Sequence, residues 1–382
     1  MNSYERVLAC LNHSEPDQIP FDLGGTPMTG IHITAYHNLR RHAGITGGDE
    51  KIEDIMQQLA YVDENFHQYF RTDVRKALAR ASDRSDVRFA SDGHYSSFHD
   101  VWGIGWRMPE EGGFYYDMYS HPLQEAESIA DIKKYQWPDP LEGVSFAGVR
   151  EKVMAVIQEG YMPVIGGFCP GVTTMHAWLR GFENFYMDFI LNPAIAEFIM
   201  DKVNEIKMTY WASLLSEVKD LTCIAVESDD LGSQKRTLYS PETYRKFVKP
   251  RHTQLMSFIK SSSSAKVFLH SCGAIRSVLG DLIEAGVDII NPVQKSAAGM
   301  DPIELKRDFG NDVVFWGGGV DTQNVLSSGS PGDVKDDVKR SIDALAPGGG
   351  FIFAAVHNIQ ANVPPENIIA MWQTLKKYEK YY

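Results

Sequence analysis

Short apolar runs alternate with amphipathic segments through most of the chain. The runs cover residues 19–23, a weak stretch near 72–74, 162–168, 221–226, 265–269, 287–290, 312–316 and 350–356. A continuous apolar run, in contrast to a strict apolar/polar alternation, is typical of a strand that is buried on both faces. The pattern therefore predicts a parallel β-sheet covered by helices.

The segments between the runs carry the start and stop signals of helices. Asn or Ser directly before Pro marks a helix start at Asn192, Ser240 and Ser330, and Gly286 marks a helix end. Asn and Ser side chains can accept from the unpaired amides of a first turn, and Gly tolerates the positive φ of a helix end. Eight strands that alternate with helices predict an α/β fold, a closed (β/α)8 TIM barrel that forms a single domain over residues 1–382. An open doubly wound sheet stays the alternative, although no Gly-x-Gly-x-x-Gly fingerprint follows the first run.

Residues 85–140 interrupt the alternation of apolar runs and helical segments. The stretches 98–107 and 114–119 are rich in aromatic residues and glycine. They predict an antiparallel insertion in the barrel, with two possible roles. It could form a lid over a pocket, or its aromatic side chains could simply pack the insertion itself.

Composition narrows the class of protein. The chain has 382 residues, 37 basic and 50 acidic side chains, and a formal net charge of −13. This balance argues against binding to nucleic acid or to an anionic membrane through bulk electrostatics. The four cysteines are scattered, no stretch approaches the ~20 apolar residues of a membrane span, and the N-terminus lacks the apolar core of a signal peptide. We expect a soluble, cytoplasmic protein.

The most informative motif is His270-Ser-Cys272-Gly, which follows the apolar run 265–269. An imidazole and a thiolate two residues apart can bind the same divalent ion, and Zn²⁺ is the usual ion for mixed nitrogen and sulfur ligands. The alternative is a buried cysteine next to a capping histidine. A metal site needs a third ligand from elsewhere in the chain.

Polar residues directly follow five of the runs, and the C-terminal ends of barrel strands meet at one mouth. Asp230 and Glu227 are the candidate catalytic carboxylates. Adjacent residues at a strand end point in different directions, so only one of Asp229 and Asp230 is expected to enter the mouth. The candidates for substrate binding are Asn291, Gln294, Asp321 and Gln360.

His357 is the candidate third metal ligand. It follows the last run, 87 residues after His270, so only a closed fold can bring the two together. The alternative is a strand-end histidine that hydrogen-bonds to backbone. The fourth ligand position is open to Glu227, Asp230, substrate or water, and Cys169 is a reserve ligand.

The chain resembles the uroporphyrinogen decarboxylase superfamily, and within it the corrinoid-linked methyltransferase branch. The motifs that carry this resemblance are spread over nearly the whole length, in residues 5–12, 16–20, 100–103, 121–123, 240–242, 269–273, 317–323 and 363–367. The resemblance implies a (β/α)8 barrel. Zinc methyltransferases of this superfamily use His-x-Cys after one strand and a late Cys after the last strand.

That late Cys corresponds to His357 here. The implied metal set is therefore His270, Cys272 and His357, with one thiolate fewer than the family pattern. The decarboxylases bind a multiply carboxylated tetrapyrrole without metal, through an Arg-rich segment after the first strand. Here residues 22–30 contain no arginine, and the first one after that strand is Arg40. This absence argues against a porphyrinogen substrate.

The resemblance implies a zinc-dependent methyltransferase. It would move a methyl group between a small substrate (a methoxylated aromatic, a methylamine or a thiol) and a corrinoid, or cobalamin, carried by a partner protein. O-demethylation is favoured, because the aromatic insertion could cover a flat substrate. Two alternatives remain. One is a metal-free decarboxylase with Asp230 as polar anchor, and the other is a non-catalytic barrel that binds a corrinoid protein or a tetrapyrrole.

Overall fold

The computed structural model of the protein describes residues 1–48, 50–77 and 87–381. Its main sheet has seven parallel strands in the order β13-β12-β11-β10-β9-β8-β3, so neighbours in the sheet follow one another along the chain. The strands are β3 Val74–Lys76, β8 Met162–Gly166, β9 Ile224–Ser228, β10 Lys266–His270, β11 Ile289–Asn291, β12 Val314–Trp316 and β13 Phe351–Ile352. Each takes up part of one predicted apolar run.

The first predicted run forms a single bridge residue and no strand of its own. Phe21 pairs in parallel with Phe353, and the backbone N–H of Asp22 donates to the carbonyl of Phe353 over 2.8 Å. On its other side, the N–H of Asp73 donates to the carbonyl of Phe21, also over 2.8 Å. The segment therefore links the two edge strands, β13 and β3. The predicted barrel fold is confirmed, with one strand position reduced to this bridge.

Apolar side chains of the strands fill the inside of the barrel. Val74, Val226, Phe268 and Trp316 belong to one buried cluster that also includes residues of helix α1, Ser3–Leu11. The N–H of Tyr4 donates to the carbonyl of Gly160, just before β8. Helix α1 therefore covers the N-terminal ends of the strands, which leaves the C-terminal ends for a site.

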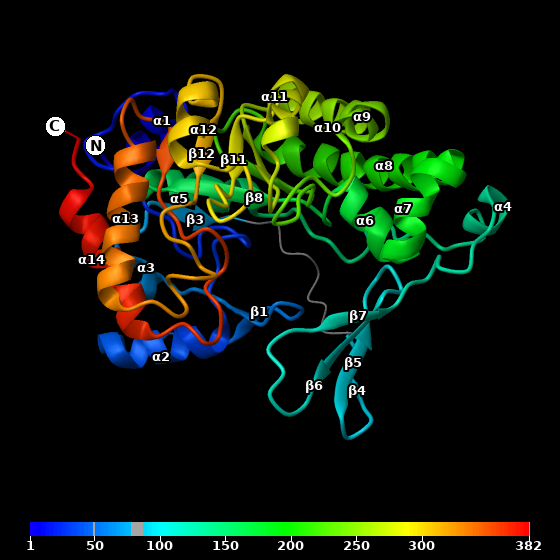
Figure 1. The fold of residues 1–382 in the computed structure, drawn as a ribbon, viewed down its shortest axis with the longest axis horizontal. Helices are drawn as coiled ribbons and strands as arrows, with labels where there is room; N and C mark the ends of the chain where they lie inside the picture. The colour runs from blue at the N-terminus through cyan, green and yellow to red at the C-terminus, as the bar shows by residue number, and fades with distance from the viewer. Residues whose placement is uncertain (49, 78–86, 382) are drawn as a thin grey trace.

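Most helices cover the outside of the sheet, whereas the short helix α4 lies away from it, next to α8 (Figure 1). The helices besides α1 are α2 Ile33–Ala43, α3 Glu64–Phe70, α4 Ile129–Ile132, α5 Val149–Gln158, α6 Val172–Arg180, α7 Phe182–Leu191, α8 Pro193–Val218, α9 Pro241–Thr243, the π-helix η1 Tyr244–Val248, α10 Lys249–Ser262, α11 Arg276–Ala285, α12 Pro302–Phe309, α13 Pro331–Leu345 and α14 Pro365–Tyr378. The predicted starts at Asn192, Ser240 and Ser330 and the end at Gly286, whose φ is 111°, are confirmed. Within the described ranges, no helix is both long and apolar enough to span a membrane.

The insertion is an antiparallel sheet of four strands that lies apart from the barrel sheet (Figure 1). Its strands are β4 Ala90–Ser91, β5 Tyr95–His99, β6 Gly105–Pro109 and β7 Asp117–Ser120, and a separate hairpin pairs β1 Ile52–Asp54 with β2 Leu59–Ala60. The predicted antiparallel insertion is confirmed, although residues 85 and 86 of its predicted range lie outside the described residues. Whether residues 1–382 form a single domain stays a prediction.

A buried ion pair connects helix α1 to the point where the barrel closes. The guanidinium of Arg6 donates to Asp73 over 2.6 Å, and the other oxygen of Asp73 accepts from the N–H of Phe21 over 2.7 Å. We expect Asp73→Ala to lower the free energy of unfolding by about 3 kcal/mol, because the buried guanidinium of Arg6 and the buried N–H of Phe21 then lose the carboxylate that they bind. Denaturant unfolding measures the change.

The control is Glu205→Ala, which breaks an exposed pair with Lys202 and is expected to cost less than ~1 kcal/mol. An Asp73→Ala midpoint that matches the midpoint of this control would contradict the role of Asp73 in barrel closure.

Candidate metal centre

Three predicted ligands lie together at the C-terminal ends of the strands. His270 is the last residue of β10, Cys272 follows two residues later, and His357 comes after β13. One ligand atom from each lies within 4.8 Å of the others, and the distance from His270 Nε2 to Cys272 Sγ is 3.3 Å. A tetrahedral zinc ion with bonds of about 2.0–2.1 Å to nitrogen and 2.3 Å to sulfur places such atoms roughly 3.5 Å apart. The three side chains therefore fit a zinc ion, whose binding stays a prediction.

A close backbone approach shapes the loop that carries Cys272. Gly273 has a φ of 87°, and a Cβ added there would lie 2.4 Å from the carbonyl carbon of Gly232. Only glycine fits both the positive φ and this contact. The glycine of the motif thus lets the loop after β10 turn against the loop after β9.

Asn291 determines which nitrogen of His270 can bind a metal. The Asn291 Nδ2 donates to the carbonyl of Trp316 over 2.8 Å, so the Asn291 Oδ1 faces His270 Nδ1 at 2.5 Å. A carbonyl oxygen only accepts, so Nδ1 carries the proton and Nε2 keeps its lone pair. Asn291 was predicted to bind substrate; the structure places it, fully buried, behind His270. The signal in the sequence was its position at the end of the next predicted strand, and the structure adds its register with His270.

Burial controls the protonation of the other two ligands. Burial, together with the nearby Asp230 carboxylate, raises the pKa of the Cys272 thiol well above its usual value. Burial, with a smaller effect from His270, lowers the pKa of His357 to about 4. His357 is therefore neutral at pH 7 with a lone pair available, whereas the thiol needs a cation to become a thiolate.

Asp229 and Asp230 point in different directions, as their adjacency predicts. The Asp230 Oδ1 accepts from the N–H of Cys272 over 2.9 Å and lies 3.9 Å from His270 Nε2, and its side chain is half exposed. Asp229 is buried. Its carboxylate accepts from the N–H of Thr174, in the first turn of α6, and lies 3.0 Å from His252 Nε2. Only Asp230 belongs to the neighbourhood of the three ligands.

Glu227 lies in the wall of the barrel. Its carboxylate is buried, forms an ion pair with Lys207 Nζ at 2.7 Å and accepts from Trp211 Nε1 at 2.5 Å. It is not in the group formed by the three ligands. The sequence analysis missed Lys207. The available signal was its spacing of four residues from Val203 and Trp211, which puts it on the apolar face of α8.

The other three predicted polar residues bind neighbouring loops. The Gln294 Oε1 accepts from the N–H of Gly273 over 2.7 Å, and therefore supports the loop of Cys272. Asp321 accepts from the N–H groups of Gln323 and Asn324, and Gln360 donates to the carbonyl of Asn358. Contact of these side chains with a substrate stays a prediction.

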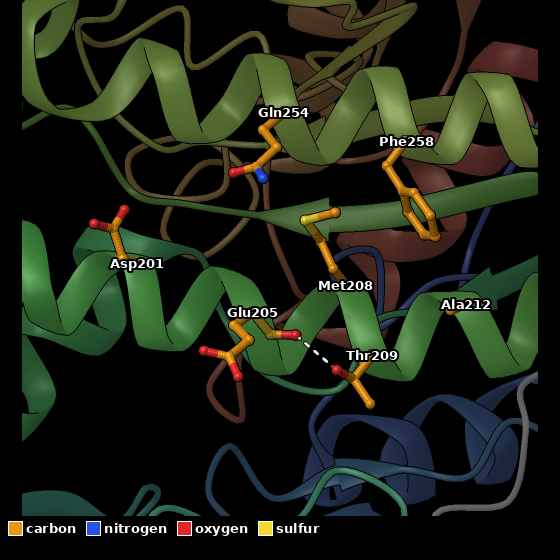
Figure 2. A pocket seen from close by; sticks show the side chains of 7 residues that line it. All are labelled: Asp201, Glu205, Met208, Thr209, Ala212, Gln254 and Phe258. Carbon is orange, nitrogen blue, oxygen red and sulfur yellow. Dashed lines mark hydrogen bonds between the residues drawn. The ribbon is translucent and has the colours of Figure 1, made fainter.

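A groove elsewhere contains none of these residues. Figure 2 shows it between helices α8 and α10, on the outside of the barrel. It is lined by Asp201, Glu205, Met208, Thr209, Ala212, Gln254 and Phe258. The groove is separate from the candidate metal centre.

Comparison with known proteins places the chain in a family. The profile of the family "Uroporphyrinogen decarboxylase (URO-D)" matches residues 100–378. The chain belongs to the uroporphyrinogen decarboxylase family. The resemblance stated from the sequence is thereby confirmed.

Relatives of this URO-D family protein include methyltransferases and decarboxylases. Methylcobamide:CoM methyltransferase MtaA of Methanosarcina barkeri is 29% identical over 251 residues, 64% of this chain and 68% of the relative. Uroporphyrinogen decarboxylase of Geobacter sulfurreducens is 25% identical over 264 residues, 66% and 71% of the two chains. A solved methyltransferase from Methanosarcina mazei, 19% identical, covers 99% of both chains with a TM-score of 0.65, which shows the shared fold. The match to the M. barkeri methyltransferase supports the methyltransferase branch.

The role of Asn291 leads to a prediction. In Asn291→Leu, His270 loses the acceptor that fixes its tautomer, and we expect zinc affinity to fall about 10–100-fold. Competition with a chromophoric chelator measures this affinity. The control is Gln360→Leu, which removes only a hydrogen bond within its own loop.

The melting temperature of the metal-free protein separates this effect from unfolding. Zinc affinity of Asn291→Leu equal to that of the Gln360→Leu control would show that Asn291 does not orient a metal ligand.

Proposed function

We propose that this URO-D family protein is a zinc-dependent methyltransferase. It would move a methyl group between a small methylated substrate and a corrinoid carried by a partner protein. The observation that carries the proposal is the convergence of His270, Cys272 and His357 at the C-terminal ends of the strands. Catalytic zinc sites use three protein ligands and keep the fourth position for a substrate or water.

The surrounding residues fix this ligand set in place. Asn291 orients His270, while Asp230 and Gln294 accept from the two backbone amides around Cys272. A bound zinc ion would supply Lewis acidity to an oxygen, sulfur or nitrogen atom of the small molecule. A fixed ligand geometry favours this chemistry, because little reorganisation is then needed during the reaction.

Asp230 is the candidate to handle a proton or to hold the substrate. One of its oxygens binds the loop of Cys272, and its half-exposed side chain faces the same neighbourhood as His270 Nε2. A carboxylate in that place can accept a hydrogen bond from a hydroxyl, an amine or a thiol. Glu227, which is paired with Lys207, would support the barrel wall below the site.

The corrinoid partner is supported by one relative. The name of the M. barkeri protein, methylcobamide:CoM methyltransferase, states that its methyl group comes from a methylcobamide. We extend this type of chemistry to the present chain and favour demethylation of a methoxylated aromatic, because Trp102 of the aromatic insertion packs against Phe168, in the loop that follows β8. Zinc, the corrinoid partner and the O-demethylase type are parts of the proposal.

A metal-free decarboxylase is the second candidate. The decarboxylase relative from G. sulfurreducens favours it. The absence of arginine in residues 22–30 disfavours it, since a multiply carboxylated substrate needs local positive charge. In this alternative Asp230 would be the polar anchor. Active protein without zinc would support it.

Cys272→Ala tests the proposed function. We expect the variant to lose stoichiometric zinc and at least ~100-fold in methyl transfer, because the only charged ligand of the set is removed. Its melting temperature should change little, since Cys272 lies in a partly exposed loop outside the strands. Metal analysis and transfer of the methyl group to reduced cobalamin are the measurements.

Cys169→Ala is the matched control. Cys169 is also partly exposed, but it is not in the group of three ligands. We expect this control to keep zinc and activity. Full zinc and activity in Cys272→Ala would rule out the proposed site.

A further inference from the structure

Several hydrogen-bond donors converge on the buried carboxylate of Asp229, the residue that follows β9. Its Oδ1 accepts from the N–H of Thr174 over 2.8 Å, and from the hydroxyls of Thr173 and Thr174 over 2.6 and 2.9 Å. Its Oδ2 accepts from the N–H of Thr173 over 3.2 Å and lies 3.0 Å from His252 Nε2. A buried carboxylate with this many donors is held in one orientation.

His252 supports Asp229 from a second helix, α10. A carboxylate only accepts, so the His252 Nε2 has a proton and donates it to Asp229. The His252 Nδ1 faces the hydroxyl of Tyr244 at 3.1 Å, and both side chains are buried. Helices α6 and α10 therefore bind the same carboxylate.

Gly171, the residue before α6, packs directly on Asp229. A Cβ added at Gly171 would lie 2.2 Å from both the Cβ and the Cγ of Asp229. The φ of Gly171 is −68°, which any residue adopts without strain, so glycine is needed here for the close approach and not for its backbone conformation. Packing and hydrogen bonds together fix the position of the carboxylate.

The Thr174 hydroxyl links Asp229 to Asp230. The hydroxyl has a single proton, which it donates to Asp229, because a carboxylate only accepts. The lone pairs of the hydroxyl then point away from Asp229, and one of them accepts from the backbone N–H of Asp230 over 3.1 Å. Asp229 therefore determines the direction in which Thr174 can accept.

The residues on either side of Asp230 are bound by the loop of the metal ligands. The N–H of Asp229 donates to the carbonyl of His270 over 2.8 Å, and the N–H of Leu231 donates to the hydroxyl of Ser271 over 3.0 Å. The amide of Asp230, between them, is bound by α6. Three consecutive amides thus fix the backbone from which the Asp230 side chain extends.

The Asp230 side chain depends on this backbone because it is half exposed. Its Oδ1 accepts from the N–H of Cys272 over 2.9 Å and lies 3.9 Å from His270 Nε2. An exposed carboxylate loses rotamer entropy when it is held in one position, and water competes for its hydrogen bonds. A fixed backbone limits the side chain to the rotamers that its φ and ψ allow, and so favours the one that reaches Cys272.

We propose that Thr174 is a positioning residue of the candidate metal centre. Its hydroxyl, oriented by Asp229, fixes the backbone of Asp230 and thereby holds the Asp230 carboxylate on the amide of Cys272. The inference rests on the proposed function, since it concerns the same site, and it adds helix α6 to the elements that build this site. The effect of Thr174 on the Cys272 amide does not require a bound metal.

Selective ¹⁵N-cysteine labelling of the full-length protein measures this amide, because the chain has only four cysteines. The amide proton of Cys272 resonates downfield while it donates to a carboxylate. We expect Thr174→Val, which keeps the side-chain shape without the hydroxyl, to move this proton upfield, and Thr174→Ser to restore the wild-type shift. The buried Cys10 and Cys223 are internal references, and Cys272→Ala assigns the signal.

Zinc affinity is the second measurement. We expect Thr174→Val to weaken zinc binding about three- to tenfold, the equivalent of one lost hydrogen bond, in competition with a chromophoric chelator. Thr174→Ser should bind zinc like the wild type.

Thr173→Val is the matched control. The Thr173 hydroxyl also donates to Asp229 Oδ1, but within the described part of the chain no hydrogen bond joins Thr173 to Asp230. Both valine variants should lower the melting temperature, since each loses a hydrogen bond to a buried carboxylate. Only Thr174→Val should change the Cys272 amide and the zinc affinity.

A double-mutant cycle with Asp230→Ala shows whether Thr174 acts through Asp230. In the Asp230→Ala background we expect Thr174→Val to change neither the Cys272 amide nor the zinc affinity, because the carboxylate that Thr174 positions is absent. An unchanged Cys272 amide in Thr174→Val, equal effects of the two valine variants, or a full effect of Thr174→Val in the Asp230→Ala background would overturn the positioning role.

The outcomes distinguish this inference from the proposed function. Protein whose Cys272 amide depends on Thr174, but which binds no zinc and transfers no methyl group, would overturn the proposed function and keep the positioning role. Protein that binds zinc and transfers a methyl group, but whose Cys272 amide is independent of Thr174, would overturn the positioning role and keep the methyltransferase.

Discussion

The parallel register of β10 with β11 is the constraint on which the candidate site depends. It places Asn291 directly opposite His270, so the amide of one strand end can fix the tautomer of the imidazole on the next. The bridge of Phe21 with Phe353 holds the last strand in place and therefore positions the segment that carries His357. A shift of one residue in the β10–β11 register or in the Phe21–Phe353 bridge would turn the side chains at these strand ends to the other face of the sheet. The metal ligands would then no longer lie together.

Positions at strand ends could be predicted from the sequence, but their partners could not. The apolar runs located seven of the strands and the His-x-Cys motif located two ligands, because burial and strand ends leave a local pattern. The first run was predicted as a strand and forms one bridge residue, Phe21. Its backbone partners, Phe353 and Asp73, lie far from it in the sequence. Such contacts leave no periodicity in the sequence.

Glu227 and Asn291 show the same limit. Both follow apolar runs, and both were predicted to act on a substrate. The structure pairs Glu227 with Lys207 of α8, twenty residues earlier, and pairs Asn291 with His270. Which partner a strand-end side chain takes depends on helix packing and strand register, and neither is encoded within a short window of residues. Direct roles of Glu227 and Asn291 in substrate contact stay predictions.

The central claim is that one thiolate and two imidazoles bind the metal. Two neutral ligands and one anionic ligand would leave a zinc ion with more positive charge than a set with two thiolates, and therefore a stronger Lewis acid. Zinc K-edge X-ray absorption of the loaded protein tests this most directly. The account predicts one sulfur at about 2.3 Å and two histidine nitrogens at about 2.0–2.1 Å, with one histidine lost in His357→Ala. Identical spectra for the wild type and His357→Ala, or a first shell without sulfur, would contradict it.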